Sequence, residues 1–338
     1  MDTVRPHRRT DRSTLDRRTL DRRPLDRRPL VTAAFAAVAG LVLLTGCGAA
    51  AVDSAAAPAA TPVGVDFPVT VDSADGPLTL PTRPERIVSL SPTATESLFA
   101  VGAGDQVVAV DDQSTFPAGV PSTALSGFTP NAEAVAGYRP DLVVVSDDLG
   151  GIVDALRTLQ VPVLIQPAVT TVQEAWEQME ALGDATGNAA EAATLVAVLQ
   201  ERFEAAVASV PAGAQGLSVY HELDASLYTA TSRTFVGSVE QALGLVNVAD
   251  AVKAGNDYPQ LSAEFLVQVG PEVVVLADTV CCGETATTFA ARPGFSAIPA
   301  VLSGRVIEVD DALASRWGPR LVDFAEQLAA ALGRTSTS

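Results

Sequence analysis

The segment NAEAVAGYRPDLVVVSD, residues 131–147, recurs without a gap as SAEFLVQVGPEVVVLAD, residues 262–278. Each copy begins with a residue suited to cap a helix, continues with Ala-Glu and a short helical stretch, and ends in proline with an acid, an apolar strand and an aspartate. The two copies stand at a constant offset of 131 residues. This match predicts that the chain contains two copies of one α/β unit.

Apolar strands alternate with helical segments on both sides of each copy. We expect strands at 86–90, 107–110, 142–145 and 161–165 in the first half, and at 217–220, 273–276 and 306–309 in the second. Helices are expected at 93–101, 152–159, 236–243 and 319–332. Strands that are apolar throughout are typical of parallel sheets covered on both faces. The predicted fold class is therefore α/β, with two Rossmann-like lobes that each contain a parallel sheet.

A stretch with no strand signal, residues 189–210, separates the two halves. It is rich in strong helix formers and lacks glycine and proline, so one helix of about 20 residues would span roughly 30 Å. It is either an ordinary surface helix or one long, stiff connector. We place the N-terminal lobe at 67–185, the connecting helix at 186–210 and the C-terminal lobe at 211–338. Because ligands of open parallel sheets bind outside the carboxyl ends of the strands, two such edges predict a ligand cleft between the lobes.

Residues 1–46 have the order of a secretory signal peptide. A basic leader with ten arginines fills residues 1–29, and the apolar run at 30–44 is shorter than the roughly 20 residues of a spanning helix. The sequence Leu-Thr-Gly that precedes Cys47 is similar to the bacterial lipoprotein box, and an incidental cysteine is the alternative. Residues 47–66 have the composition of a flexible tether. We expect Cys47 to be lipidated and to anchor the protein on the extracytoplasmic face of the cytoplasmic membrane.

The charge of the chain excludes one class of partner. Removal of residues 1–46 takes ten basic and five acidic residues from totals of 22 and 40, and leaves a net charge near −23. A nucleic-acid binder needs a basic face, and the chain has a single lysine, Lys253. Nucleic acid is therefore not expected as a partner.

Two adjacent cysteines, Cys281 and Cys282, are the only ones besides Cys47. Export makes their oxidation feasible, but a bond between neighbours strains the intervening peptide. The sequence leaves both a vicinal disulfide and two free thiols open.

Four motifs in a fixed order resemble a known family. They are RIVSLSPTATESLFAVG at 86–102, the Asn-Ala-Glu and Arg-Pro-Asp-Leu-Val elements within 131–143, YPQLSAE at 258–264 and ASRWGPR at 314–320. Together they resemble the periplasmic binding proteins whose two lobes are bridged by one long helix, over about residues 84–333. That family serves importers of iron-siderophores, haem and cobalamin.

The resemblance implies a function and a set of partners. It implies the substrate-binding component of an ABC importer, which captures an iron chelate or a cobalamin-type corrinoid and delivers it to a permease dimer with its ATPase subunits. A monomer and a small hinge motion are expected. A sensor lipoprotein that uses the same fold without a transporter is the alternative.

Catalysis has little support in the residues. His221 is the only histidine outside the leader, and although acids stand near it, the chain lacks a Gly-x-Ser-x-Gly elbow. A secreted hydrolase is a minor alternative. One histidine without a Cys-x-x-Cys pair also leaves too few ligands for a zinc site. We expect no enzyme, no resident cofactor and no protein metal site, with metal held only inside a bound ferric siderophore, haem or cobalamin.

Candidate ligand-binding residues stand where strands should end, and they combine aromatic walls with a few polar groups. In the first lobe they are Ser91, Asp111, Asp112, Gln113, Phe116 and Phe128. In the second they are Tyr220, His221, Glu222, Tyr228, Arg233, Arg316 and Trp317. The alternative role for each of these aromatic residues is burial in the hydrophobic core. Acids outnumber cations near these strand ends, which favours a corrinoid or a hydroxamate-type chelate over a strongly anionic catecholate complex.

Glu133 and Glu264 occupy equivalent places in the two repeats, each just after a capping residue. The helix dipole alone explains a carboxylate in a first turn. The family resemblance implies in addition that these glutamates dock onto arginines of the two permease subunits.

Overall fold

The computed structural model describes residues 66–252 and 255–334, which belong to one compact unit spanning residues 60–338. The predicted signal peptide, Cys47 and nearly all of the predicted tether lie outside the described residues, as does Lys253. No described helix is long and apolar enough to cross a membrane.

The N-terminal lobe is built on a parallel sheet with the strand order β4-β3-β5-β6. Its strands are β3 (Ile87–Ser89), β4 (Val107–Val110), β5 (Leu142–Val145) and β6 (Val163–Ile165). The helices are α1 (Pro92–Ala100), α2 (Ala132–Ala136), α3 (Ile152–Thr158) and α4 (Val172–Thr186). An antiparallel hairpin, β1 (Val69–Ser73) and β2 (Gly76–Leu80), packs Val71 and Leu80 onto one apolar cluster of this lobe. The sequence patterns did not predict this hairpin.

The C-terminal lobe repeats this topology. Its parallel sheet has the order β10-β9-β7-β8, with strands β7 (Ser218–Glu222), β8 (Val246–Asn247), β9 (Val273–Leu276) and β10 (Val306–Glu308). Its helices are α6 (Phe235–Ala242), α7 (Ala263–Val269), α8 (Thr279–Cys282), α9 (Ala286–Ala290), α10 (Pro299–Leu302), α11 (Asp311–Ser315) and α12 (Leu321–Gly333). In both sheets the first strand lies between the second and the third, so the predicted pair of parallel-sheet α/β lobes is confirmed.

The sequence repeat has a direct structural counterpart. Strands β5 and β9 begin 131 residues apart and are buried along their whole length. Each is preceded by a capped helix, because the side chain of Asn131 accepts a hydrogen bond from Ala134 N at 2.9 Å and that of Ser262 accepts one from Phe265 N at 3.1 Å. A capped short helix followed by a buried strand is therefore the shared unit.

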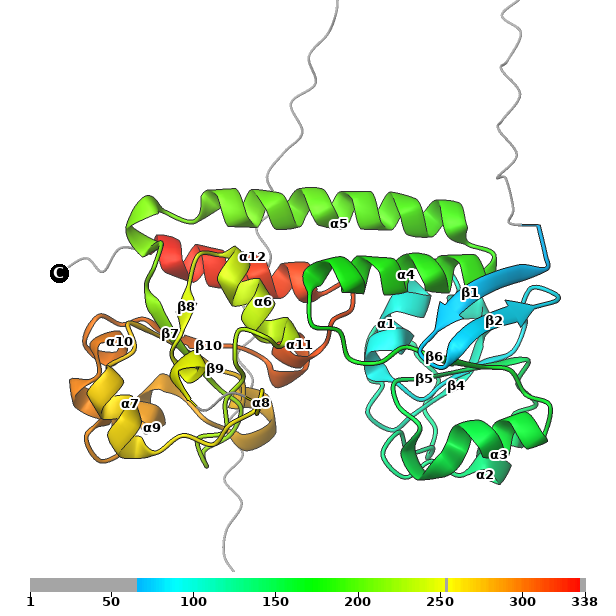
Figure 1. Ribbon diagram of the computed structural model, residues 1–338, viewed down its shortest axis with the longest axis horizontal. Coiled ribbons are helices and arrows are strands. Elements are labelled where there is room, and N and C mark those ends of the chain that lie inside the picture. The colour runs from blue at the N-terminus through cyan, green and yellow to red at the C-terminus, as the bar shows by residue number, and fades with distance from the viewer. Residues whose placement is uncertain (1–65, 253–254, 335–338) are drawn as a thin grey trace, which may run out of the picture. The chain divides into compact units, whose positions relative to one another are not determined.

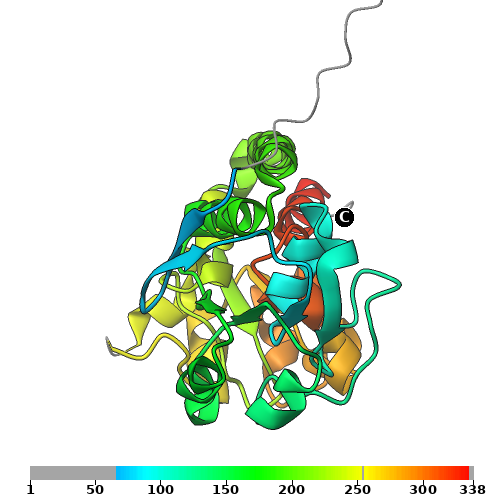
Figure 2. The same cartoon turned by 90° about the vertical axis from the view of Figure 1, so that its right-hand side faces the viewer.

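The helix α5 (Ala189–Ser209) is the predicted long connector. Figure 1 shows it running over both lobes, above α4 on one side and α12 on the other, and Figure 2 looks nearly along its axis. Arg202 of α5 pairs with Asp323 and Glu326 of α12 at 2.8 and 2.7 Å. At the other end, Gly183 of α4 allows a close approach, because a Cβ there would lie 2.3 Å from the Cβ of Ala192.

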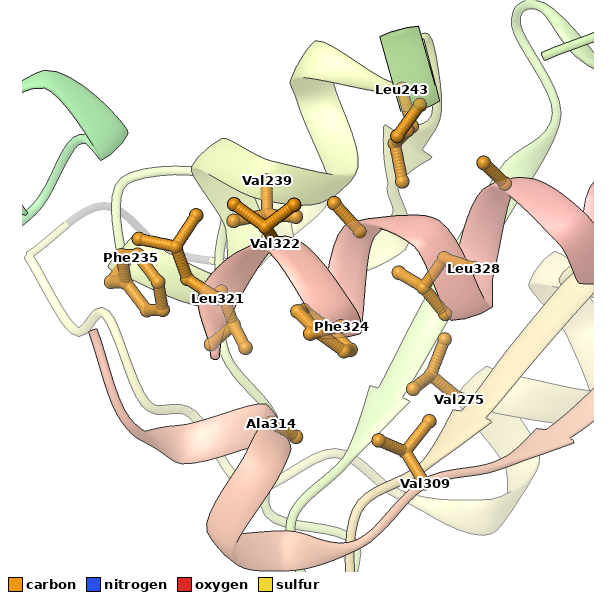
Figure 3. Packing of buried hydrophobic residues seen from close by; sticks show 14 of the residues in the cluster. Phe235, Val239, Leu243, Val275, Val309, Ala314, Leu321, Val322, Phe324 and Leu328 are labelled. Carbon is orange, nitrogen blue, oxygen red and sulfur yellow. The ribbon is translucent and has the colours of Figure 1, made fainter. Parts of the chain in front are cut away.

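The helix α4 contributes to the cores of both lobes. Its Trp176 and Met179 belong to the main cluster of the C-terminal lobe, whereas its Leu182 packs in the N-terminal lobe. Figure 3 shows the first of these clusters, in which α6 and α12 cover one face of the C-terminal sheet and Phe324 points toward Val275. The two lobes are thus joined by continuous apolar packing as well as by α5.

Candidate functional site

A cavity of about 230 Å³ lies at the junction of the two lobes, at the carboxyl ends of β7 and β9. This is the point where the strand order of the C-terminal sheet reverses, which is where open α/β sheets bind ligands. Ala168 and Val169, in the segment between β6 and α4, close it from the N-terminal side. A cavity thus lies at the expected edge of the C-terminal sheet, and two residues of the segment before α4 contribute to its wall.

The wall of the cavity is apolar with a few polar side chains. Its apolar residues include Val169, Leu223, Phe235, Val236, Ala277 and Ala314. Its other residues are His221, Tyr258, Cys281, Asp311, Ser315 and Trp317. An apolar cavity with a small number of convergent polar groups is the usual make-up of a small-molecule site.

His221 is the most buried polar residue of this wall, with 1% of its surface exposed. Its Nδ1 lies 2.8 Å from Oε1 of Glu240, which is equally buried, and its ring meets Phe324 edge-on at 6.3 Å. Its other nitrogen, Nε2, has no hydrogen-bond partner. An unpaired buried polar atom costs roughly 1–3 kcal/mol, so this one requires an explanation.

Trp317 connects the cavity to the N-terminal lobe. Its Nε1 donates a hydrogen bond to Oε1 of Gln178 in α4 at 2.9 Å. Trp317 and Ser91 also line one small void between the lobes. Ser91 is the N-cap of α1 and accepts from Ala94 N at 3.3 Å. Of the predicted ligand residues, His221 and Trp317 therefore share the wall of the cavity, and Ser91 shares a separate void with Trp317.

Tyr220 and Glu222, two further predicted ligand residues, face the side of β7 opposite to His221 and do not line this cavity. Both are fully buried, and Tyr220 donates a hydrogen bond to Glu222 at 3.1 Å. Arg292 holds Glu222 with two hydrogen bonds of 2.8 and 2.6 Å. Burial nevertheless raises the pKa of Glu222, and burial also raises the pKa of Tyr220. Side chains alternate across a strand, which separates this group from His221.

Asp278, at the end of β9, is fully buried. Both of its carboxylate oxygens lack a hydrogen-bond partner. Burial raises its pKa, and the nearby Glu284 adds to the rise. The strand-end aspartate of the second repeat is thus an unpaired buried acid.

Arg316, which was predicted to bind the ligand, forms a contact between the lobes in this structure. Its Nη1 donates to Oε1 of Glu96 in α1 at 2.8 Å, and its Nη2 donates to the carbonyl of Gln113 at 3.1 Å. Phe116, another predicted ligand residue, lies beneath the guanidinium of Arg320, 4.2 Å from it to the ring centroid. Gln113 and Phe116 therefore contact the two arginines that pair with Glu96, Arg316 and Arg320, and none of the three predicted residues lines the cavity.

The remaining predicted ligand residues also lie outside the cavity wall. Asp111 is buried and stabilises its own loop by accepting from Gln113 N at 2.7 Å and from the Ser114 hydroxyl at 3.2 Å, and burial raises its pKa. Arg233 pairs with Asp257 at 2.7 Å in an exposed contact. Asp112, Phe128 and Tyr228 are exposed, Phe128 at 74%.

Of the thirteen residues of the wall, the sequence prediction named only His221 and Trp317, and Tyr258 and Cys281 are among those it missed. Tyr258 is half exposed and begins the Tyr-Pro-Gln-Leu motif, which indicated the family but not a ligand contact of this side chain. Cys281 lies on α8, three residues past the strand-end Asp278. Cys281 and Cys282 are free and exposed thiols, so the structure has no vicinal disulfide between them.

Glu133 and Glu264 are exposed and stand at the second residue of α2 and α7. Figure 1 shows these two helices at the ends of the lobes away from α5, one on each lobe. Neither carboxylate has an ion pair among the described residues.

Other parts of the structure offer weaker sites. A groove of about 610 Å³ runs along β1 and α4, and its wall carries five carboxylates, of Asp72, Glu174, Glu177, Glu180 and Asp184. All of its charged groups are acids and none is buried, so we do not place the site there. Within residues 66–252 and 255–334, no three His, Cys, Asp or Glu side chains are grouped so that they could hold a metal ion.

Comparison with known proteins gives one family. Residues 87–313 match the family model described as periplasmic binding protein. A cobalamin-binding protein of Halobacterium salinarum is 33% identical over 282 residues, which cover 80% of this chain and 75% of that protein. The ABC transporter substrate-binding lipoprotein YvrC of Bacillus subtilis is 31% identical, over 85% of this chain and 92% of its own length.

The solved structures agree with this result. The periplasmic heme-binding protein RhuT from Roseiflexus sp. RS-1, in its apo form, superposes with a TM-score of 0.65 and 25% identity. The superposition covers 74% of this chain and 98% of that one.

Proposed function

Because this chain belongs to the periplasmic binding protein family, we propose that it captures an iron chelate or a cobalamin-type corrinoid outside the cytoplasm and delivers it to an ABC importer. The observation that carries this proposal is the apolar cavity at the reversal point of the C-terminal sheet, closed from the other side by Ala168 and Val169. A ligand there contacts both lobes at once.

The names of the relatives support this ligand class. The Halobacterium salinarum protein is named for cobalamin binding and RhuT for heme binding. The cavity supports the same ligand class, because its wall has apolar and aromatic surface but no unpaired cation among the described residues. Such a wall suits a largely apolar ligand and disfavours a strongly anionic one.

Delivery requires an anchor and a docking surface. We assign the anchor to a lipid on Cys47, in keeping with the lipoprotein name of YvrC. We assign docking to Glu133 and Glu264, whose exposed carboxylates are free to form charge-assisted pairs with arginines of two permease subunits. The same proposal includes the ATPase partner and a monomeric receptor.

A fluorescence titration tests the ligand assignment. The chain has two tryptophans, Trp176 in the core and Trp317 in the cavity wall, so a bound ligand should change mainly the emission of Trp317. Residues 60–338 should be titrated with cyanocobalamin, hemin and ferrioxamine. Saturable quenching by one of them is expected, and Trp317→Phe should remove most of the signal. Failure of all three to bind would overturn the assignment.

A further inference from the structure

Two adjacent cysteines at the edge of the cavity have no part in the proposed function. Cys281 and Cys282 follow one another in α8, and both side chains are exposed and free. Cys281 lines the cavity, whereas Cys282 does not. A hydrogen bond between the two thiols raises the pKa of Cys281 to about 12. Two sulfur atoms that are in contact and open to solvent are a site for oxidation to a disulfide.

A disulfide between these neighbours does not fit the helix in which they stand. Consecutive Cα atoms lie about 3.8 Å apart, below the usual range of about 4.4–6.8 Å for bonded cysteines. Consecutive side chains of a helix also do not face each other. The bond can therefore close only if the backbone at residues 281–282 leaves the helical conformation.

The helix α8 is weakly held, so it can make this change without disturbing a core. It has four residues, Thr279–Cys282, and none of them is buried. Its last turn is closed by a hydrogen bond from Gly283 N to Thr279 O at 3.1 Å. A second contact leaves the helix, because Cys281 N donates to Oδ1 of Asp311 at 3.1 Å. Short helices depend on packing for their stability, and α8 has little of it.

The residue before α8 is poorly accommodated in the reduced conformation. Asp278 occupies the N-cap position, where an aspartate ordinarily accepts a hydrogen bond from the first turn, but its side chain makes no such bond. Both of its carboxylate oxygens are buried without a hydrogen-bond partner. A rearrangement of α8 that brings water or an amide to this carboxylate is favourable for that reason.

We propose that Cys281 and Cys282 are a redox switch, in which oxidation to a vicinal disulfide unwinds α8, breaks its hydrogen bond to Asp311 and opens the ligand cavity. Asp311 and Cys281 both line the cavity, so this hydrogen bond ties two parts of its wall together. A ligand that enters the reduced protein must break it, whereas in the oxidised protein it is already broken. The oxidised form, which an extracytoplasmic compartment favours, is therefore the form that binds ligand more tightly. That last step rests on the proposed function.

The oxidation is a thiol–disulfide exchange with an external disulfide, that of an exported thiol oxidoreductase or of glutathione. The raised pKa of Cys281 leaves the first attack to Cys282, whose thiolate forms a mixed disulfide and releases one external thiolate. Cys281 then loses its proton and attacks the sulfur of Cys282, which releases the second external thiolate. Two electrons pass to the external disulfide, and the two cysteine protons are taken up by the released thiolates.

The test uses residues 60–338, in which Cys281 and Cys282 are the only cysteines. The protein is reduced with a phosphine, freed of it under nitrogen, and one half is treated with glutathione disulfide. Oxidation should lower the mass by about 2 Da, the two hydrogen atoms of the thiols. Amide hydrogen exchange should become faster in peptides that cover residues 279–284 and 311–315. Hemin or cyanocobalamin should bind the oxidised form about tenfold more tightly, the equivalent of one hydrogen bond.

Two variants separate the switch from other effects of oxidation. Cys282→Ala removes the bonding partner without changing a residue of the wall, so its exchange and affinity should match those of the reduced wild type after either treatment. Asp311→Ala removes the acceptor that ties α8 to the wall. In the reduced state it should bind as tightly as the oxidised wild type, and oxidation should add nothing further.

The outcomes distinguish the switch from the proposed function. Thiols that stay unbonded, or a disulfide that leaves hydrogen exchange unchanged at both segments, would overturn the switch. Equal affinities of the reduced and oxidised forms would overturn the opening of the cavity. Failure of both forms to bind hemin, cyanocobalamin and ferrioxamine would overturn the proposed function, while the mass and exchange measurements would still decide the switch.

Discussion

Arg320 of the C-terminal lobe donates two hydrogen bonds to Glu96 of the N-terminal lobe, from Nε to Oε2 at 2.9 Å and from Nη2 to Oε1 at 2.6 Å. Arg316 adds a third at 2.8 Å, and Glu96 is 2% exposed. One buried carboxylate thus joins α1 to the segment that precedes α12. Together with α4 and α5, this contact fixes the lobes at the side of the cavity where Trp317 stands.

Glu96→Gln should lower the free energy of unfolding by about 3 kcal/mol, near the lower end of the range for a broken buried ion pair. The reason is that two guanidiniums, 15% and 20% exposed, lose their counter-charge. Urea denaturation monitored by circular dichroism measures the change. Arg233→Gln, which breaks an exposed pair, is the matched control and should cost under about 1 kcal/mol. Equal effects of the two variants would contradict the assignment of Glu96 as a structural junction.

The hinge between the lobes should be small. Trp176 and Leu182, about two turns apart on α4, pack into different lobes. A wide separation of the lobes would therefore disrupt the packing of one of the two cores. Small-angle scattering of residues 60–338, with and without saturating ligand, should give nearly the same radius of gyration. A large decrease on binding would show that the packing around α4 gives way.

Glu133→Ala and Glu264→Ala should reduce uptake by cells while leaving ligand affinity nearly unchanged, with the double variant worse than either. Both side chains are exposed, and neither lines the cavity. Glu204→Ala is the control, because Glu204 is an exposed glutamate on α5, a helix distant from α2 and α7 in Figure 1. Normal uptake by a well-expressed double variant would leave both residues with only a helix-capping role.

Asp278→Asn should stabilise the protein at neutral pH. The pKa of the buried acid is raised in the folded state, so the folded state binds more protons than the unfolded one, and stability falls as the pH rises above about 3.9, the unfolded value. The variant removes this penalty. Its advantage in thermal melting should grow from pH 4 toward neutrality. An advantage that does not change with pH would mean that the carboxyl group is not the cause.

The sequence predicted the parts of the fold that are encoded locally. Buried parallel strands appear as continuous apolar runs, and a repeat at constant offset reveals two related lobes, so β5 and β9 were placed at their observed bounds. The strand β8 has two residues and leaves no recognisable pattern. The helix α4 does have a local signal, the capping box of Thr171 and Glu174, that predicts its start.

The sequence predicted the edge of the sheet where the candidate site lies, but not which side chains face the cavity. Strand ends locate the correct edge of the sheet, but only the alternation along β7 decides that His221 faces the cavity and Glu222 faces Arg292. Contacts between distant residues have no local signal. Glu96 and Arg316 are 220 residues apart, and nothing near either residue indicates the other.

The most direct test of ligand capture at the lobe junction is calorimetric titration of a blocked cavity. Ser315 is an exposed residue of the cavity wall, so Ser315→Trp fills the space without overpacking a core. The wild-type residues 60–338 and the control Ser122→Trp, an exposed site outside the wall, should bind one equivalent of hemin or cyanocobalamin. Ser315→Trp should lose that binding while keeping its melting temperature. Unchanged affinity in Ser315→Trp would place the ligand elsewhere and contradict the account.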